Sequence, residues 1–187
     1  MIAGAVFTGG RSSRYGRDKC LEVFNGQRLV QIAYLKLKEV VSDVFIVGKD
    51  YGIGKFLPDL KPHMGPLYAL LGLLKNLDEH NGVIVLPCDM PLVPVDLLKN
   101  IAMFSKEYDI VVPKHGNYYE PLVAYYSREI CSEVEKLVAS GELSMKRLLS
   151  LDVRIKFITE VELRKYGDPE EFFINVNYPE DFQKLKN

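Results

Sequence analysis

The sequence lacks most of the features that would assign it to a special class of protein. It has three cysteines in 187 residues, Cys20, Cys88 and Cys131, and they form neither a CxxC pair nor a zinc-binding pattern. This cysteine usage favours a reducing compartment. The net charge is −1, so no overall field attracts nucleic acid or an acidic membrane. We therefore expect neither of these as a partner.

Membrane-spanning and targeting segments are missing as well. No apolar run reaches the roughly 18 residues that a membrane span needs. The N-terminal stretch MIAGAVFTGG has no basic region before it and no clear cleavage site after it, which argues against a signal peptide. We interpret Ile2–Phe7 as a buried strand and expect a cytoplasmic protein.

The first part of the chain alternates short apolar runs with segments of helical periodicity. The runs predict strands at Ile2–Phe7, Asp43–Gly48, Gly82–Pro91 and Asp109–Pro113, and the periodic segments predict helices at Arg28–Val40, Pro66–Leu77 and Asp96–Ser105. Strand and helix in alternation indicate βαβ units, which build a mostly parallel sheet with helices on both faces. The fold class expected is therefore α/β.

After Pro113 the pattern changes, but no repeat, low-complexity tract or linker separates the two parts. We expect a strand with aromatic residues in HGNYYEPLVAYYS, helices at Glu129–Ala139 and Ser144–Leu151, and a strand in VRIKFI. The C-terminal stretch EEFFINVNYPEDF predicts a strand, with Asn175 and Asn177 on the same face, and then a helix from Pro179. A single domain over residues 1–187 accounts for this pattern.

A glycine-rich, basic loop follows the first strand directly. Gly9 and Gly10 come first, and the loop then carries hydroxyls and cations: Ser12, Ser13, Arg11, Arg14, Arg17 and Lys19. In an open α/β sheet the carboxyl ends of the strands form the ligand crevice, and glycine lets backbone amides approach a phosphate. The P-loop and the GxGxxG fingerprint are both absent. The alternative is a solvated loop with incidental charges, but its position favours ligand binding.

Asp89 lies just past the third predicted strand, in VIVLPCDMPLV. A carboxylate at the end of a buried strand needs solvent, a paired charge or a metal ion. Magnesium is a suitable partner because it binds one or two carboxylates together with substrate phosphates. The alternative is a cap for the following helix, although Asp96 is closer to that position. The histidines His63, His80 and His115 show no metal-ligand spacing, and we interpret them as surface or loop residues.

Several of these motifs resemble those of the nucleotidyltransferases with a Rossmann-like fold. The loop from Phe7 to Gly26 resembles the family's LAGGxSxRMGxDKxLxxxxG signature, and the CDMP that contains Asp89 resembles its metal-binding CDxP. Gly65-Pro66 is similar to a GPLxG segment beside the nucleotide, and Asn175 to Asn177 resemble the family's NxNTPEDL. Asp59 resembles an aspartate that contacts the nucleotide. These matches extend over nearly the whole chain.

The resemblance implies a three-layer α/β/α fold with a mostly parallel central sheet, in which residues 1–113 form a nucleotide-binding half and residues 114–187 an acceptor-side half. Taken together, the motifs look most like those of the molybdenum cofactor guanylyltransferases. Such enzymes transfer GMP from GTP to the phosphate of molybdopterin with Mg²⁺ and release pyrophosphate. Carrier or acceptor proteins of the molybdenum cofactor are further partners that this implies.

The resemblance also implies roles for individual residues. Arg14, Lys19 and Asp89 are the expected catalytic residues, and Asp89 is the metal ligand. The acceptor is expected at Arg14, Asn175 and Asn177. The nucleotide is expected at Phe7, Thr8, Gly9, Gly10, Lys19, Asp59, Gly65 and Asp89.

Two other functions stay open at this point. A related cytidylyltransferase or sugar-phosphate nucleotidyltransferase would share the loop and the aspartate, although Gly9 is more typical of the guanylyl enzymes. A nucleotide-binding module without catalysis is the second, because the chain departs from the family pattern at Phe7-Thr8, Tyr15 and Ala69. Glu120 is a further departure, in an element that resembles the family's QPL or HPT of the acceptor lobe. The lack of a Ser/His/Asp or Cys/His set does not argue against transfer, since an ionised phosphate nucleophile needs no such base.

Overall fold

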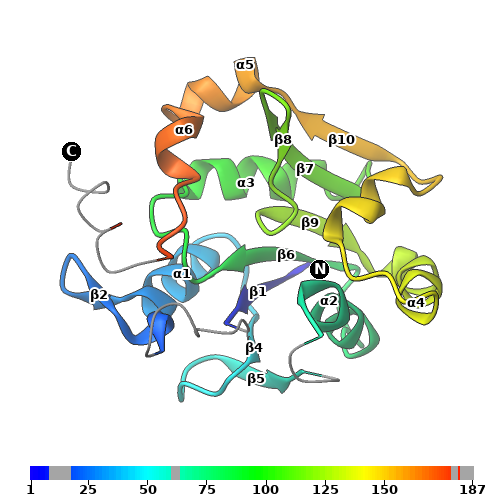
Figure 1. Cartoon of the computed structure of the whole chain (residues 1–187), viewed down its shortest axis with the longest axis horizontal. Helices are drawn as coiled ribbons and strands as arrows, with labels where there is room; N and C mark the ends of the chain where they lie inside the picture. The colour runs from blue at the N-terminus through cyan, green and yellow to red at the C-terminus, as the bar shows by residue number, and fades with distance from the viewer. Residues whose placement is uncertain (9–17, 60–63, 178–180, 182–187) are drawn as a thin grey trace.

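A twisted sheet with helices on both faces forms the core of the chain (Figure 1). We describe it from a computed structural model, which covers residues 1–8, 18–59, 64–177 and 181. Over these residues the main sheet has eight strands in the order β10-β7-β9-β6-β1-β4-β5, with β8 paired to β7. The strands are β1 (Ala3–Phe7), β4 (Val44–Gly48), β5 (Lys55–Pro58), β6 (Gly82–Pro87), β7 (Ile110–His115), β8 (Tyr118–Tyr119), β9 (Ala124–Ser127) and β10 (Ile155–Ile158).

The helices occupy the connections between these strands. The α-helices are α1 (Leu29–Lys38), α2 (Pro66–Lys75), α3 (Val95–Phe104), α4 (Cys131–Ala139), α5 (Glu160–Leu163) and α6 (Pro169–Phe172). Short 3₁₀ turns are η2 (Lys19–Leu21), η3 (Arg128–Ile130), η4 (Met145–Ser150) and η5 (Arg164–Tyr166), and a small hairpin is formed by β2 (Val23–Phe24) and β3 (Gln27–Arg28).

The strand pairing is mostly parallel, as predicted. β1 is parallel to both β4 and β6, β4 to β5, and β7 to β10. Only β9 and β8 run antiparallel to their neighbours among the strands of this sheet that the structure describes. Because the chain passes from β1 to β4 and β5 and then returns to β6 on the other side of β1, the direction of winding reverses between β1 and β6. Ligands of open α/β sheets bind at the carboxyl side of such a point.

Each inner strand contributes alternate side chains to two separate apolar layers. In β6, Ile84 and Leu86 pack toward α1 and α3, whereas Val83 and Val85 pack toward α2 and α4. Figure 1 shows α2 and α4 side by side on their face of the sheet. A strand covered on both faces must be apolar throughout, which is why β6 is a continuous buried run.

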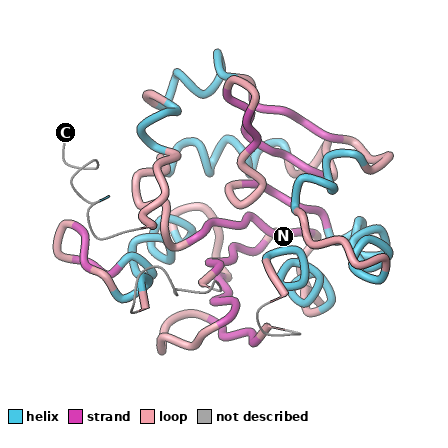
Figure 2. Tube along the Cα trace, in the orientation of Figure 1, coloured by secondary structure: helices cyan, strands magenta, loops and turns pink. Residues whose placement is uncertain are grey.

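The C-terminal part differs from its prediction. The stretch at residues 171–177 ends α6 and continues as an extended segment outside the sheet, so the strand predicted for Asn175 and Asn177 is wrong (Figure 2). Its apolar residues are used differently, since Phe172 and Phe173 pack in the core and Val176 in a small cluster with α1. The predicted helix Ser144–Leu151 is a 3₁₀ turn, and α5 has no counterpart in the prediction. The helix predicted from Pro179 lies outside the described residues.

Two histidines are buried. His80 lies in the loop before β6, as predicted, whereas His115 lies at the end of a strand. His80 is 5% exposed, and its Nε2 lies 3.0 Å from Asp43 Oδ2. His115 is 8% exposed at the end of β7, where its ring stacks on Phe173 at 5.1 Å between centroids. The prediction of a surface or loop position is therefore wrong for His115, whose burial is possible because Glu120 supplies a polar partner. His63 lies outside the described residues.

Gly82 begins β6 where β9 passes closely. A Cβ at Gly82 would lie 2.5 Å from Tyr125 Oη and 2.6 Å from the carbonyl oxygen of Tyr126. We expect Gly82→Ala to lower the free energy of unfolding by about 1–3 kcal/mol, because backbone of the neighbouring strand cannot move aside. Urea denaturation measures this loss.

Gly4→Ala is a matched substitution at a second glycine, for which we expect a smaller loss of stability. Its Cβ would meet only side-chain atoms, with Val41 Cγ2 nearest at 3.0 Å. Side chains can adjust by a few tenths of an ångström, so the loss for Gly4→Ala should be the smaller one. An equal or smaller loss for Gly82→Ala would contradict the close approach of β9.

Candidate active site

The carboxyl ends of β1 and β6 lie together at the point where the winding reverses. The amide of Cys88 donates to the carbonyl of Phe7 at 3.2 Å, so the segments that leave the two strands start as neighbours. Thr8 is held toward β4, because its amide and its hydroxyl both donate to the carbonyl of Val47, at 3.0 and 2.9 Å. This edge of the sheet therefore has a fixed backbone from which ligand-binding side chains can project.

Lys19 and Asp89 meet at this edge. Lys19 begins η2 after β1, Asp89 follows β6, and Lys19 Nζ donates to Asp89 Oδ2. Their side chains are 20% and 15% exposed, respectively, so both are largely enclosed but still reach solvent. The alternative role of Asp89 as a helix cap is not observed, since Pro94 occupies the N-cap of α3. Because both side chains still reach solvent, each can leave the other and bind a ligand instead.

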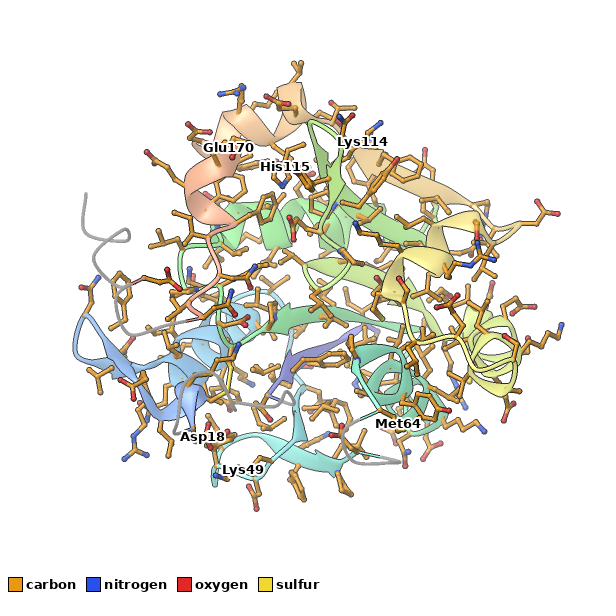
Figure 3. All side chains as sticks on the ribbon, viewed as in Figure 1. Asp18, Lys49, Met64, Lys114, His115 and Glu170 are labelled. Carbon is orange, nitrogen blue, oxygen red and sulfur yellow. A yellow bond between two sulfur atoms is a disulfide. The ribbon has the colours of Figure 1, made fainter. Side chains whose placement is uncertain are left out.

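Asp18 fixes the start of η2. Its carboxylate accepts from the Cys20 amide at 3.1 Å, from Lys49 Nζ at 2.6 Å and from the Tyr51 hydroxyl at 2.9 Å (Figure 3). Burial raises the pKa of Asp18, but the hydrogen bonds from Lys49 and Tyr51 outweigh it and hold the pKa below its ordinary value. The Asp18 side chain thus connects the start of η2 to the segment that follows β4.

Lys36 holds the segment after Asp89 through hydrogen bonds to its backbone. It projects from α1 and donates through Nζ to the carbonyls of Pro91 and Val93, at 2.6 and 2.5 Å. Burial lowers the pKa of Lys36 to about 8, although the nearby charge of Glu39 opposes this. The sequence did not identify Lys36, because a lysine at a helical position looks like an ordinary surface residue.

A disulfide joins the same two segments. Cys20 directly follows Lys19, Cys88 directly precedes Asp89, and their Cα atoms are 5.9 Å apart. Both cysteines are buried, while Cys131 is a free thiol of intermediate exposure. The spacing of the cysteines gave no indication of this pair, because 68 residues separate its members in the sequence.

The segment with the two predicted asparagines also reaches Asp89. The Val176 amide donates to the Asp89 carbonyl at 2.8 Å, and the Asn177 amide donates to Asp181 Oδ2 at 2.9 Å. Val176 is buried, whereas Asn175 and Asn177 on either side of it are exposed. Although no strand forms here, the two amide side chains flank the residue that is bonded to Asp89.

The remaining predicted residues lie along the same edge or outside the described part. Asp59 follows β5, two strands from β1, which corresponds to roughly 10 Å across the sheet. Gly65 is the N-cap of α2 with φ +92°, a conformation that favours glycine. Gly9, Gly10, Arg11, Ser12, Ser13, Arg14, Tyr15 and Arg17 lie outside the described residues.

Glu120 and His115 form a polar pair on the other side of β6. Glu120 Oε1 lies 3.0 Å from His115 Nε2, and the carboxylate of Glu170 is 3.7 Å from His115 Nδ1 (Figure 3). Burial raises the pKa of Glu120, and the hydrogen bond with His115 opposes that rise. Since β9 separates β7 from β6, the pair is roughly 10 Å along the edge from β6. His115 is a residue that the sequence analysis did not place near a site.

A cavity of about 880 Å³ lies at the opposite edge of the sheet, where it is lined by residues such as Ile2, Asn81 and Asp109 that precede β1, β6 and β7. The part of the chain that the structure covers contains no cluster of three or more His, Cys, Asp or Glu side chains able to hold a metal. Its helices are all too short or too polar to cross a bilayer.

Known proteins resemble this chain over almost its whole length. A family model described as the MobA-like NTP transferase domain matches residues 4–156. A protein named probable molybdenum cofactor guanylyltransferase, from Geobacillus sp. (strain WCH70), is 30% identical over 98% of this chain and 97% of its own. The molybdenum cofactor guanylyltransferase of Campylobacter jejuni (strain RM1221) is 26% identical over 97% and 94% of the two chains.

A solved structure resembles it as well. The molybdopterin-guanine dinucleotide biosynthesis protein A of Archaeoglobus fulgidus superimposes with a TM-score of 0.82 over 98% of this chain and 96% of its own, at 24% identity. This likeness confirms the predicted α/β fold with a mostly parallel central sheet flanked by helices.

Lys36 makes a pH-dependent contribution to stability. Its pKa falls from 10.5 in the unfolded chain to about 8 in the folded one. Between these values the unfolded chain binds more protons, so the contribution of Lys36 to stability rises with pH. Below pH 8 both states are protonated and the full cost of burying the charge is present.

We therefore expect wild type to gain stability relative to Lys36→Met as the pH rises from 8 to 10.5. The gain is on the order of 2–3 kcal/mol, since each pKa unit corresponds to about 1.4 kcal/mol. Urea denaturation of both proteins at several pH values measures the difference, and the comparison removes the other titrating groups. A constant difference across this range would show that Lys36 keeps an ordinary pKa in the folded protein.

Proposed function

The chain belongs to the family of MobA-like NTP transferases, and from that premise we propose that it transfers GMP from GTP to the phosphate of molybdopterin and releases pyrophosphate. The relatives named molybdenum cofactor guanylyltransferase support both substrates, because they align with nearly the full chain. The observation that carries the proposal is the contact of Lys19 Nζ with Asp89 Oδ2 at the reversal point of the sheet. A cation and a carboxylate are thereby available at one place for a metal–triphosphate complex.

Asp89 suits a magnesium ion that arrives with the nucleotide. Its carboxylate already accepts a cation, the Lys19 ammonium, and it is partly open to solvent. Magnesium needs only one or two protein carboxylates when substrate phosphates complete its shell, so the lack of a three-residue metal cluster among the described residues does not conflict with this role. When bound, the ion would neutralise charge on the phosphates.

The residues of the chain would act mainly by positioning and charge. The nucleophile is a phosphate oxygen that is ionised at neutral pH, so the transfer needs no general base. Lys19 would leave Asp89 for the triphosphate and stabilise the negative charge that moves onto the departing pyrophosphate. Asp18, through Lys49 and Tyr51, would hold η2 so that Lys19 projects at the correct place.

The acceptor would lie on the side of β6 away from β4. Asn175 and Asn177 flank Val176, whose amide is bonded to the Asp89 carbonyl, so their side chains are within reach of an acceptor phosphate or of metal-bound water. Arg14 and the amides of Gly9 and Gly10 are proposed to contact acceptor and nucleotide through the loop that precedes η2. Residues 1–113 and 114–187 would thus supply the nucleotide and acceptor halves of one domain, and carrier proteins for the cofactor are further proposed partners in the cytoplasm.

The ion pair provides the main mutational test. We expect Asp89→Asn and Lys19→Met each to lower the rate of guanylyl transfer about 10²–10³-fold, because each removes one preorganised electrostatic contact. Pyrophosphate release from GTP in the presence of molybdopterin measures the rate. CTP in place of GTP, in the same assay, tests the choice of base.

Asp96→Asn and Lys99→Met are matched controls. They alter an exposed ion pair of α3, in which Lys99 Nζ lies 3.3 Å from Asp96 Oδ1, by the same substitutions. Since exposed pairs contribute little, these variants should keep activity within about twofold of wild type. Full activity in both Asp89→Asn and Lys19→Met would exclude the proposed site.

Metal dependence provides a separate test. Removal of divalent cations with a chelator should abolish the transfer, and added Mg²⁺ should restore it in wild type. Asp89→Asn should need a higher Mg²⁺ concentration for half its maximal rate, because one ligand is lost. If wild type remains active after chelation, Asp89 has a role other than metal binding.

A further inference from the structure

The disulfide Cys20–Cys88 has no role in the proposed reaction, although it lies beside the proposed site. One cysteine is the sequence neighbour of Lys19 and the other is the sequence neighbour of Asp89. Two links therefore connect η2 to the end of β6: the covalent bridge and the ion pair beside it. Any change in the bridge acts on the backbone next to both charged residues, because each cysteine is the sequence neighbour of one of them.

The bridge limits how far η2 can separate from β6. Its Cα atoms are 5.9 Å apart, and the two cysteines are 1% and 2% exposed within the core formed with α1 and α3. On its other side η2 is held by the carboxylate of Asp18 and by the packing of α1. If the bridge opened, the Lys19–Asp89 ion pair, which solvent can reach, would still connect η2 to the end of β6.

We propose that Cys20–Cys88 is a redox-active cystine that controls nucleotide binding at the Lys19–Asp89 site. This inference rests on the proposed function for its ligand, the Mg²⁺–GTP complex. In the oxidised form the bridge fixes the positions of Lys19 and Asp89 relative to each other, and nucleotide binds tightly. In the reduced form η2 moves away from the end of β6 more easily, so part of the binding free energy is used to order it again.

The chemistry is thiol–disulfide exchange with a dithiol. One thiolate of the dithiol attacks a sulfur of the bridge and forms a mixed disulfide, and the Cys20–Cys88 bond breaks. The second thiolate then displaces the protein sulfur, so the dithiol leaves as a disulfide. The protein gains two electrons and two protons as two cysteine thiols, and the reverse exchange with an oxidised dithiol restores the bridge.

The reducing compartment expected from the cysteine usage favours this role over a purely structural one. The cysteine count favours a reducing environment, where disulfides of most proteins are transient and serve catalysis or redox sensing. Because both sulfur atoms are buried, the exchange requires local opening of η2, and a small dithiol is the suitable reagent. Binding of nucleotide across Lys19 and Asp89 opposes that opening and should slow the reduction.

The experiment compares the oxidised and reduced forms of the full chain. Protein prepared without reductant is verified by thiol titration, which should find one free thiol, that of Cys131, and three after treatment with dithiothreitol. Hydrogen exchange then measures the amides of residues 18–22 and, as a reference, those of β10. Binding of Mg²⁺–GTP to both forms is measured by calorimetry.

We expect reduction to accelerate amide exchange in residues 18–22 without changing β10, and to weaken Mg²⁺–GTP binding about tenfold through lost preorganisation. Cys131→Ser is the matched control and should respond as wild type does. The double variant Cys20→Ser with Cys88→Ser should resemble the reduced form and be insensitive to dithiol. The comparison of the two wild-type forms needs no variant, so it remains decisive if the double variant does not fold.

The two hypotheses fail in different ways. Equal exchange rates and equal affinities in both redox forms, or three free thiols in the oxidised preparation, would overturn the redox role and leave the transferase proposal intact. If GTP binds neither form but CTP binds the oxidised form more tightly than the reduced form, the guanylyl transfer proposal fails and the redox control of nucleotide binding is supported.

Discussion

The ion pair between Lys19 and Asp89 is the interaction on which the candidate site depends. Its partners come from segments 70 residues apart, and they meet because β1 and β6 are adjacent and parallel. A carboxylate at the end of a buried strand is costly without a partner, and Lys19 supplies one. In the proposed reaction the pair would divide between a metal ion and a triphosphate, since both side chains reach solvent.

The surrounding contacts all hold backbone segments in place, and they leave the charged ends of Lys19 and Asp89 bonded to each other. Asp18 anchors the beginning of η2, Lys36 holds the carbonyls after Asp89, and Val176 is bonded to the carbonyl of Asp89 itself. The disulfide is part of the same support. Electrostatic catalysis benefits from this arrangement, because preorganised groups need no reorganisation when charge develops on the phosphates.

The sheet is built differently on the two sides of β6. The parallel strands β1, β4, β5 and β6 carry the loop residues, Asp59 and Asp89, whereas the antiparallel β9 separates them from β7 with His115 and Glu120. This inserted strand widens the edge of the sheet by one strand spacing, roughly 4.8 Å. In the proposed reaction, this width would give room for a second substrate beside the nucleotide.

The sequence by itself determined the fold class, the main strands and helices, and the two charged residues of the site. A continuous apolar run bounded by turn residues, such as the predicted strand Gly82–Pro91, is typical of a strand covered on both faces, and the structure shows that strand at Gly82–Pro87. A glycine-rich basic loop or an aspartate directly after such a strand is expected at its carboxyl end. Only the tertiary structure decided the partners of Cys20, Lys36, His115 and Val176. Each is an ordinary residue in its local sequence, and its role comes from a distant segment: Cys88, the carbonyls of Pro91 and Val93, Phe173, and the carbonyl of Asp89. Local periodicity reports which face of an element is buried, but it contains no information on which remote group will lie against that face.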